Sequence, residues 1–383
     1  MSSSNETHNS DEGQNIEEID DEEAGKYDRN ESYAEETLPR QSLSREIISE
    51  CISMPYRLGY GFSHAFIKLD CSDRRLSDIE ILRSYIHLRF VILTGNFITD
   101  ITPVSHIGHL IYLKADNNQI ERVDCLNKLR FLQYLDLSGN KLTTINDLKL
   151  PFLQHLKVNE NAIETLNPTG YGIPPEQFPA LATLELRSNR LTSFEGIGAL
   201  TTLTSLYCAE NSLRDTSGLS KLTGLVRLHA RDNRISRLNG ITPAMSGLEY
   251  LNLRGNRISS FRAVKVLSVL PSLKVLNLLQ NPICDKDEYR LTVIGLISRL
   301  QKLDKERVTD SERADGAAVV ASKRDWEEEA SEAEAMEEHH NVEGLAEEAG
   351  EEGGEVPNEQ QPTEDQEDEN AEEEEEEEDD EED

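Results

Sequence analysis

Apolar residues recur in one pattern along most of the chain. The motif LxxLxLxxNxL, with conservative replacements, occurs nine times between residues 88 and 283. The copies are LRFVILTGNFI, LIYLKADNNQI, LQYLDLSGNKL, LQHLKVNENAI, LATLELRSNRL, LTSLYCAENSL, LVRLHARDNRI, LEYLNLRGNRI and LKVLNLLQNPI. Their asparagines stand at positions 96, 118, 140, 161, 189, 211, 233, 256 and 281. Such a repeat predicts a leucine-rich repeat solenoid.

Every copy predicts the same structural unit. The leucines turn inward, and the central three residues form a short strand that pairs in parallel with the next strand, about 4.8 Å away. The asparagine lies where the chain leaves the strand, and its amide satisfies backbone groups of its own and the neighbouring turn. The rest of each unit is short and predicts a 3₁₀ or single helical turn on the convex side. The predicted fold is therefore an α/β solenoid with a parallel concave sheet.

A solenoid needs closed ends. We expect an N-terminal helical cap at residues 43–66, with an apolar helical face that Pro55 ends. The solenoid and its C-terminal cap then span residues 67–304, and a degenerate extra turn lies within 64–87. Residues 305–340 predict a projecting helix with a break at Gly316. Glycine and proline clusters predict a bulging loop at residues 165–180, which is either a tolerated insertion or a docking loop.

Charge separates the two ends of the chain from its middle. The net charge is −35, yet residues 326–383 hold 31 Asp and Glu with no Lys or Arg. Residues 1–42 and 341–383 therefore predict acidic, disordered arms, and the repeats between them are mildly basic. The C-terminal arm is either a solubility tail or a segment that docks on a basic surface. Trp326 either patches the solenoid or anchors a partner.

Several classes of protein are excluded by what the sequence lacks. No apolar run is long enough for a transmembrane helix, and residues 1–14 do not resemble a signal peptide. The five scattered cysteines indicate reduced thiols in the cytosol or nucleus, and Cys208 takes the place of a core leucine. The acidic balance argues against nucleic acid as a partner.

The chain also lacks the motifs of an enzyme. It has no GxGxxG, P-loop, GxSxG or HExxH sequence, so we expect no catalytic residue, no small-molecule substrate and no cofactor. His106 and His109 stand three apart, but no further ligand joins them at metal-binding spacing. A binding function is the remaining expectation.

The candidate site is the concave face, where the residues that flank the inward leucines point outward. Aromatic and arginine side chains are enriched among interface anchors. The candidates are Phe90, Tyr112, Tyr134, His155, Arg187, Tyr207, Arg227, His229, Arg231, Tyr250 and Arg254. We expect solvent-facing rings here and a partner helix or extended segment across the strands. The alternative is that these rings are merely the aromatic residues that any sheet face favours.

Several stretches go beyond the general repeat. They are ILRSYIHLRFVILTGN, HLIYLKADNN, LHARDNRI, LEYLNLRGN and YRLTVIGLISRLQKLDKE. Over residues 58–310 the chain resembles the leucine-rich repeat-containing protein 23 family of motile cilia and flagella. The resemblance implies a non-enzymatic structural subunit of the axoneme, in the head or bridge of a radial spoke, that is needed for cilium motility. It also implies a hetero-oligomeric assembly with other radial-spoke or axonemal proteins in the cytoskeleton.

Two other functions share parts of this plan. An acidic leucine-rich nuclear protein, acting as a histone chaperone or phosphatase inhibitor, also joins a solenoid to an acidic tail. That family has about half as many repeats and no acidic N-terminal arm. A phosphatase-targeting subunit shares the 22-residue repeat. The identity of the direct partner stays open at this point.

Overall fold

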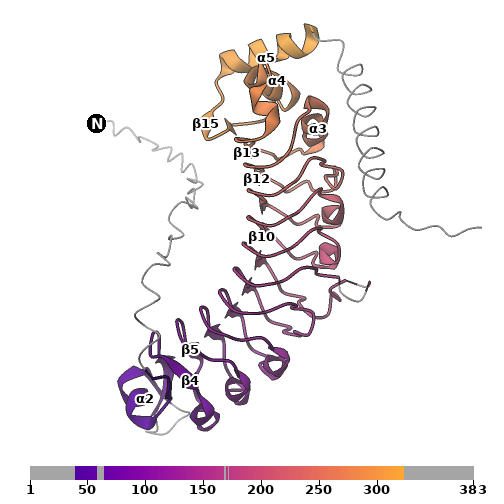
Figure 1. The fold of residues 1–383 in the computed structure, drawn as a ribbon. Coiled ribbons are helices and arrows are strands. Elements are labelled where there is room, and N and C mark those ends of the chain that lie inside the picture. The colour runs from indigo at the N-terminus through magenta and orange to yellow at the C-terminus, as the bar shows by residue number, and fades with distance from the viewer. Residues whose placement is uncertain (1–38, 58–63, 168–169, 171, 323–383) are drawn as a thin grey trace, which may run out of the picture. The chain divides into compact units, whose positions relative to one another are not determined.

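The computed structural model describes residues 39–57, 64–167, 170 and 172–322, and its main sheet in those residues has 13 strands. In spatial order the sheet runs from β15 through β14 to β5, then β3 and β2 (Figure 1). The strands are β2 (Ile52–Arg57), β3 (His64–Asp70), β5 (Phe90–Ile92), β6 (Tyr112–Lys114), β7 (Tyr134–Asp136), β8 (His155–Lys157), β9 (Thr183–Glu185), β10 (Ser205–Tyr207), β11 (Arg227–His229), β12 (Tyr250–Asn252), β13 (Val275–Asn277), β14 (Lys302–Leu303) and β15 (Glu306–Arg307).

The repeat motif and the sheet coincide. Strands β5 to β13 are the central residues of the nine motifs, and they pair in parallel with equivalent motif positions opposite one another, as in Leu113 with Leu135. The inward leucines, such as Leu113, Leu135 and Leu156, are fully buried, and so is Cys208 in its leucine position. The predicted leucine-rich repeat solenoid is confirmed.

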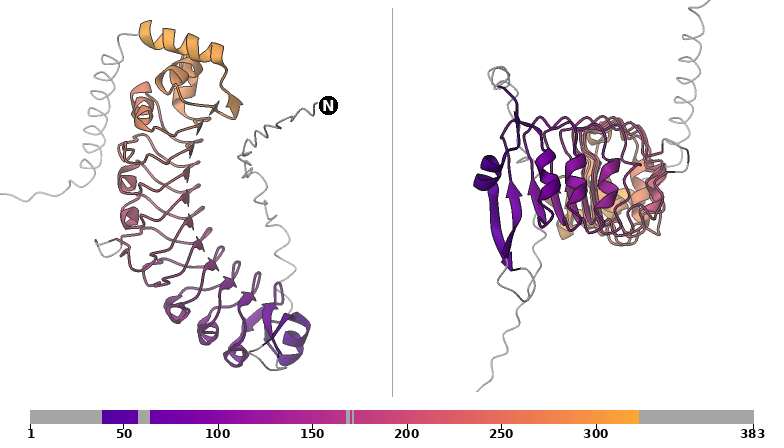
Figure 2. Two further views of the ribbon diagram at one scale, coloured as in Figure 1. Left: turned by 180° about the vertical axis from the view of Figure 1, so that it is seen from behind. Right: turned by 90° about the horizontal axis from the view of Figure 1, so that it is seen from below.

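Short helical turns cover the side of the stack opposite the strands. The strands line the concave side and the turns the convex side, as the views from the front and from behind both show (Figures 1 and 2). The 3₁₀ turns are η3 (Glu80–Ser84), η4 (Thr102–His106), η5 (Asp124–Lys128), η6 (Ile197–Ala199), η7 (Ser217–Leu219), η8 (Val266–Val269) and η9 (Pro282–Asp285), and the helix α3 is Phe261–Lys265. The convex 3₁₀ turns agree with the prediction.

The asparagines form a ladder of hydrogen bonds between turns. Asn118 is typical: its Nδ2 donates to the carbonyls of Leu93 and Ala115 at 2.9 and 3.1 Å, and its Oδ1 accepts from the Ile98 amide at 3.1 Å. Each buried amide thus satisfies backbone groups of two turns. The last rung is Asp304, whose carboxylate accepts from the Leu278 amide at 2.7 Å.

The N-terminal end is part helix and part hairpin, so the expectation of a helical cap across 43–66 needs correction. Helix α2 (Arg45–Cys51) begins at Ser44, whose hydroxyl accepts from the Ile47 amide. It ends before Pro55, because β2 already pairs antiparallel with β3. Proline is tolerated there because β2 is the edge strand of the sheet. The short strands β1 (Gln41–Ser42) and β4 (Leu76–Asp78) pair beside it.

The C-terminal end packs two helices together. Helix α4 (Tyr289–Leu296) is followed by β14, β15 and helix α5 (Asp310–Ser322). Helix α5 begins with a capping box, in which the Thr309 amide donates to the Glu312 carboxylate at 2.8 Å and the Glu312 amide donates back to the Thr309 hydroxyl.

The two helices cross at a pair of glycines. A Cβ on Gly316 would lie 2.5 Å from the Leu291 carbonyl oxygen, and one on Gly295 would lie 2.2 Å from the Gly316 carbonyl oxygen. Residues 310–322 therefore pack on α4, whereas the sequence predicted a projecting helix. The helix continues through Gly316, whose place is set by this contact.

The insertion at 165–180 contains no helix or strand among its described residues, as its glycines and prolines predict. Its described residues 172–180 are attached to the stack, whereas the sequence predicted a bulging loop. Ile173 and Phe178 are buried in the core, and the Leu150 amide donates to the Gln177 carbonyl at 2.9 Å. These two apolar side chains and the backbone hydrogen bonds of Ile173 and Gln177 hold residues 173–178 against the stack.

The acidic arms fall almost wholly outside the described residues, as do residues 323–340 with Trp326. The predictions made for these segments stay predictions. Within the described ranges, no helix is long and apolar enough to cross a membrane.

Candidate partner-binding face

Four aromatic rings lie side by side along the N-terminal half of the concave face and form a ladder. Phe90, Tyr112, Tyr134 and His155 are the first residues of β5 to β8, so parallel pairing sets them side by side. The centroid of the Tyr112 ring lies 4.4 Å from that of Tyr134, and the planes differ by 7°. The outer contacts, Phe90 with Tyr112 and Tyr134 with His155, are tilted at 6.3 and 6.2 Å. The sequence-predicted ladder is therefore one continuous surface.

The central rings of this ladder are less exposed than expected. Tyr112 and Tyr134 are half-buried, because each ring covers its neighbour, while His155 at the end is exposed. Burial, followed by the nearby Asp136 carboxylate, raises the pKa of Tyr134 well above its usual value. Tyr134 thus stays neutral, and the flat faces of the two stacked tyrosines are held in place before any partner arrives.

Three more candidates form a second stack farther along. Tyr207, His229 and Tyr250 stack with centroids 4.5 and 4.6 Å apart. His229 lies between two rings and is only 7% exposed, so it supports its neighbours more than it offers a surface. Arg227, the first residue of β11, is exposed beside this stack.

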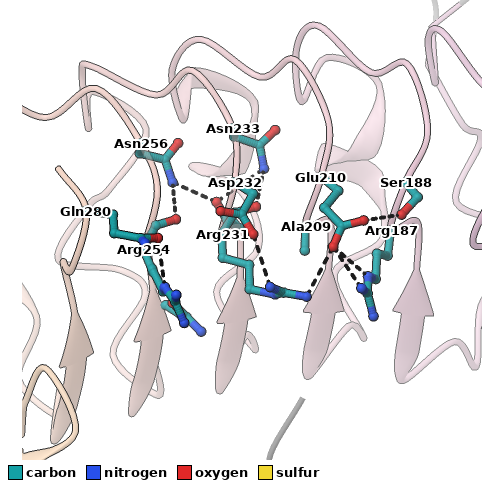
Figure 3. A network of polar contacts seen from close by, with 12 residues as sticks. Arg187, Ser188, Ala209, Glu210, Arg231, Asp232, Asn233, Arg254, Asn256 and Gln280 are labelled. Carbon is teal, nitrogen blue, oxygen red and sulfur yellow. Dashed lines mark hydrogen bonds and ion pairs between the residues drawn. The ribbon is translucent and has the colours of Figure 1, made fainter. Parts of the chain in front are cut away.

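The arginine candidates are held in a network within the face. Figure 3 shows Glu210 between Arg187 and Arg231, with distances of 2.7 and 3.2 Å to the two guanidinium groups. Burial opposes ionisation of Glu210, but bonds from the Ser188 hydroxyl and from Arg187 outweigh it and lower its pKa. Arg254 donates to the Gln280 side chain at 3.0 Å. These cations are positioned before binding, which reduces the entropy lost on contact.

Other charges on the face are paired between or along strands. Lys157 lies 2.9 Å from Glu185 on the next strand, and Lys114 lies 3.7 Å from Asp116. Such pairing across strands stabilises the sheet by a modest amount. With these charges paired to one another, the stacked rings are the apolar surface that this face offers to a partner.

A third row of rings was missed by the sequence reasoning. His109, Phe131 and Phe152 each stand three residues before a ladder residue, where the chain turns into the strand. Their centroids lie 5.7 and 6.3 Å apart in stacked pairs. The signal was available, since each ring directly precedes the first leucine of its motif. We call these three residues the flank stack.

The arrangement is suited to binding. Among the residues that the structure describes, no group of three or more His, Cys, Asp and Glu is placed to hold a metal ion. What the face presents is two rigid rows of aromatic rings, with cations fixed at defined positions between strands.

Comparison with known proteins identifies the family. Sequence models described as "Leucine-rich repeat" and "Leucine Rich repeats (2 copies)" match residues 181–332 and 109–150. Leucine-rich repeat-containing protein 23 from Bos taurus is 37% identical over 298 residues, which cover 72% of this chain and 79% of that protein. The chain belongs to the leucine-rich repeat-containing protein 23 family.

Two further similarities extend beyond this family. Cilia- and flagella-associated protein 410 from Homo sapiens is 46% identical over 67 residues, or 17% of this chain and 26% of that protein. A solved structure, that of a TLR13–ssRNA13 complex, superposes with a TM-score of 0.52 at 22% identity, over 62% of this chain and 35% of that one. The latter shows the shared fold alone. Family and fold together support a protein-interaction scaffold.

Proposed function

We propose that this protein is a non-enzymatic structural subunit of the ciliary or flagellar axoneme, placed in a radial spoke at its head or bridge. It binds a spoke partner through the concave face, and cilium motility requires it. Membership in the leucine-rich repeat-containing protein 23 family supports this proposal. The match to a protein named for its association with cilia and flagella points in the same direction.

The observation that carries the binding mode is the ring ladder Phe90–Tyr112–Tyr134–His155. Its four side chains come from four successive strands, so a segment that crosses the strands contacts all of them at once. Stacked rings lose little side-chain freedom on binding because their orientation is already fixed. A partner helix or extended segment is the occupant that suits such a row.

The test is extraction of demembranated axonemes from motile ciliated cells that express tagged protein in place of their own. We expect the wild-type protein to stay with the axoneme through detergent and moderate salt and to leave with chaotropic extraction. The variant Tyr112→Ala/Tyr134→Ala should leave at lower salt, together with fewer companion subunits. Val269→Ser, which changes an exposed residue on the convex side, is the matched control and should behave as wild type.

Two outcomes would contradict different parts of the proposal. Loss of the wild-type protein into the detergent or low-salt supernatant would overturn the axonemal role and favour a nuclear or phosphatase partner. Tight retention of a folded Tyr112→Ala/Tyr134→Ala variant would instead overturn the concave face as the contact surface.

A further inference from the structure

The flank stack is an exposed row of rings that lies among basic residues. Phe131 and Phe152 are 49% and 54% exposed, which is high for phenylalanine, and His109 stacks on Phe131. The repeat fold does not require rings at this position. In the five later motifs the equivalent residues are Ala180, Thr202, Gly224, Gly247 and Ser272.

The surrounding sequence is basic in an acidic protein. The four seven-residue segments that lead into β5 to β8 are 84–90, 106–112, 128–134 and 149–155, and none contains Asp or Glu. They carry Arg89, Lys128, Arg130 and Lys149, and the last three are exposed. Two exposed carboxylates adjoin these segments: Asp124, which begins the same turn η5 as Lys128 and lies 3.3 Å from Arg122, and Asp147, which stands two residues before Lys149. The basic residues of this flank outnumber its acidic ones, so it is locally positive, whereas the acidic excess behind the net charge of −35 lies in the two arms of the chain.

We propose that the flank stack is a second docking site, which binds an acidic segment of another protein that carries apolar side chains two residues apart. The apolar spacing follows from the rings, whose centroids are 5.7 and 6.3 Å apart. In an extended chain, side chains on one face are about 6.6 Å apart, so neighbouring ones match neighbouring rings. The acidic character follows from Lys128, Arg130 and Lys149, which stand within three residues of Phe131 or Phe152 in the sequence and attract carboxylates over a Debye length of about 10 Å.

This site is independent of the concave-face proposal. The ring ladder there is made of strand residues, while the flank stack precedes the strands and involves different side chains. A protein that uses both sites would hold two neighbours, or two segments of one neighbour, at fixed separation.

The experiment measures fluorescence anisotropy of a labelled peptide, Glu₄-Leu-Glu-Leu-Glu₄, with the full-length protein at low salt. We expect binding that weakens by about tenfold or more in Phe131→Ser/Phe152→Ser, since exposed aromatic anchors dominate such contacts. Lys128→Glu/Arg130→Glu/Lys149→Glu should abolish it. The control Arg214→Glu/Lys221→Glu/Lys265→Glu changes the net charge equally at exposed positions elsewhere and should bind as wild type. Tyr112→Ala/Tyr134→Ala should also retain binding.

Specificity is tested with three further probes. Replacing both leucines of the peptide by serine, or every glutamate by lysine, should remove binding. Equal binding of the serine peptide, or equal weakening by the control charge reversals, would reduce the effect to general charge attraction and overturn the proposal. Preferential binding of a single-stranded oligonucleotide at the same residues would also overturn it. If the peptide binds only after residues 1–38 or 326–383 are deleted, the occupant is the chain's own arm and not a partner.

Discussion

The rings of Tyr112 and Tyr134 lie face to face, with centroids 4.4 Å apart and planes that differ by 7°. The two residues are equivalent in successive repeats, so the geometry of the stack is a direct product of the 22-residue spacing. Both rings are half-buried, and their contact contributes to folding as well as to the binding surface.

This contact predicts a measurable coupling between the two tyrosines. In a double-mutant cycle with Tyr112→Ala and Tyr134→Ala, we expect a coupling energy of about 0.5–1.5 kcal/mol, the value typical of stacked aromatic pairs. Chemical denaturation of the four proteins provides the measurement. The core variant Leu135→Ala serves as a reference and should lose about 2–5 kcal/mol of unfolding free energy through a cavity. Additive single mutations would show that the rings do not interact in solution.

The asparagine ladder predicts a large cost for losing one rung. Asn140 is buried and donates to the carbonyls of Ala115 and Leu137, and its Oδ1 accepts from the Ile120 amide. In Asn140→Ala these backbone groups lose their partner, and each such buried group costs about 1–3 kcal/mol. We expect the free energy of unfolding, measured by denaturant titration, to fall by several kilocalories per mole. The exposed control Gln133→Ala should change it little. A small loss would mean that water replaces the amide.

The sequence predicts those parts of the fold in which the same type of residue recurs at the same position of every repeat. A leucine at each inward position and an asparagine at each bend need only their own periodicity to be recognised, and Cys208 fits because it is small and apolar. The ring ladder could be predicted for the same reason, since Tyr112 and Tyr134 share a motif position. The sequence carries this information because each turn contacts mainly its neighbours.

Features set by contacts between different kinds of element were harder to predict. Gly316 looks like a helix breaker in sequence, but it is the place where α5 meets Gly295 of α4. His229 looks like an exposed anchor, but rings on both sides bury it. Phe178 lies among turn residues and still enters the core. In each case the environment of the residue depends on a contact with another segment, which the local sequence pattern does not reveal.

The C-terminal cap predicts a pH dependence of stability. The Arg290 guanidinium lies 2.7 Å from the Glu312 carboxylate, and together with the Thr309 amide it lowers the pKa of Glu312 from 4.5 to about 2. A lowered carboxyl pKa stabilises the folded state above the unfolded value of 4.5, and the gain is lost as the pH falls from 4.5 towards 2.

Thermal unfolding of wild type and Glu312→Gln across this range gives the test. At pH 6 the wild-type protein should be more stable than Glu312→Gln. The difference in stability between the two proteins should shrink as the pH falls below 4.5. Glu121→Gln, which changes an exposed glutamate between β6 and η5, is the control and should follow wild type throughout. A difference that stays constant with pH would show that the charge of Glu312 does not contribute.

The glycine contact between α4 and α5 predicts that Gly316→Ala destabilises the cap, although alanine favours a helix over glycine by about 1 kcal/mol. The added Cβ would lie 2.5 Å from the Leu291 carbonyl oxygen, which belongs to backbone and cannot rotate away. Helix α5 must therefore shift away from α4. Hydrogen exchange should show faster exchange of the α5 amides, and the free energy of unfolding should fall.

The matched control is Ala318→Gly, on the exposed side of the same helix. It should cost about 1 kcal/mol through helix propensity alone and leave the contact with α4 intact. If Gly316→Ala instead raises stability, the helices do not pack as closely in solution, and residues 310–322 project from the solenoid as their composition first indicated. Loss of stability in Gly316→Ala with protected α4 amides would locate the damage in α5.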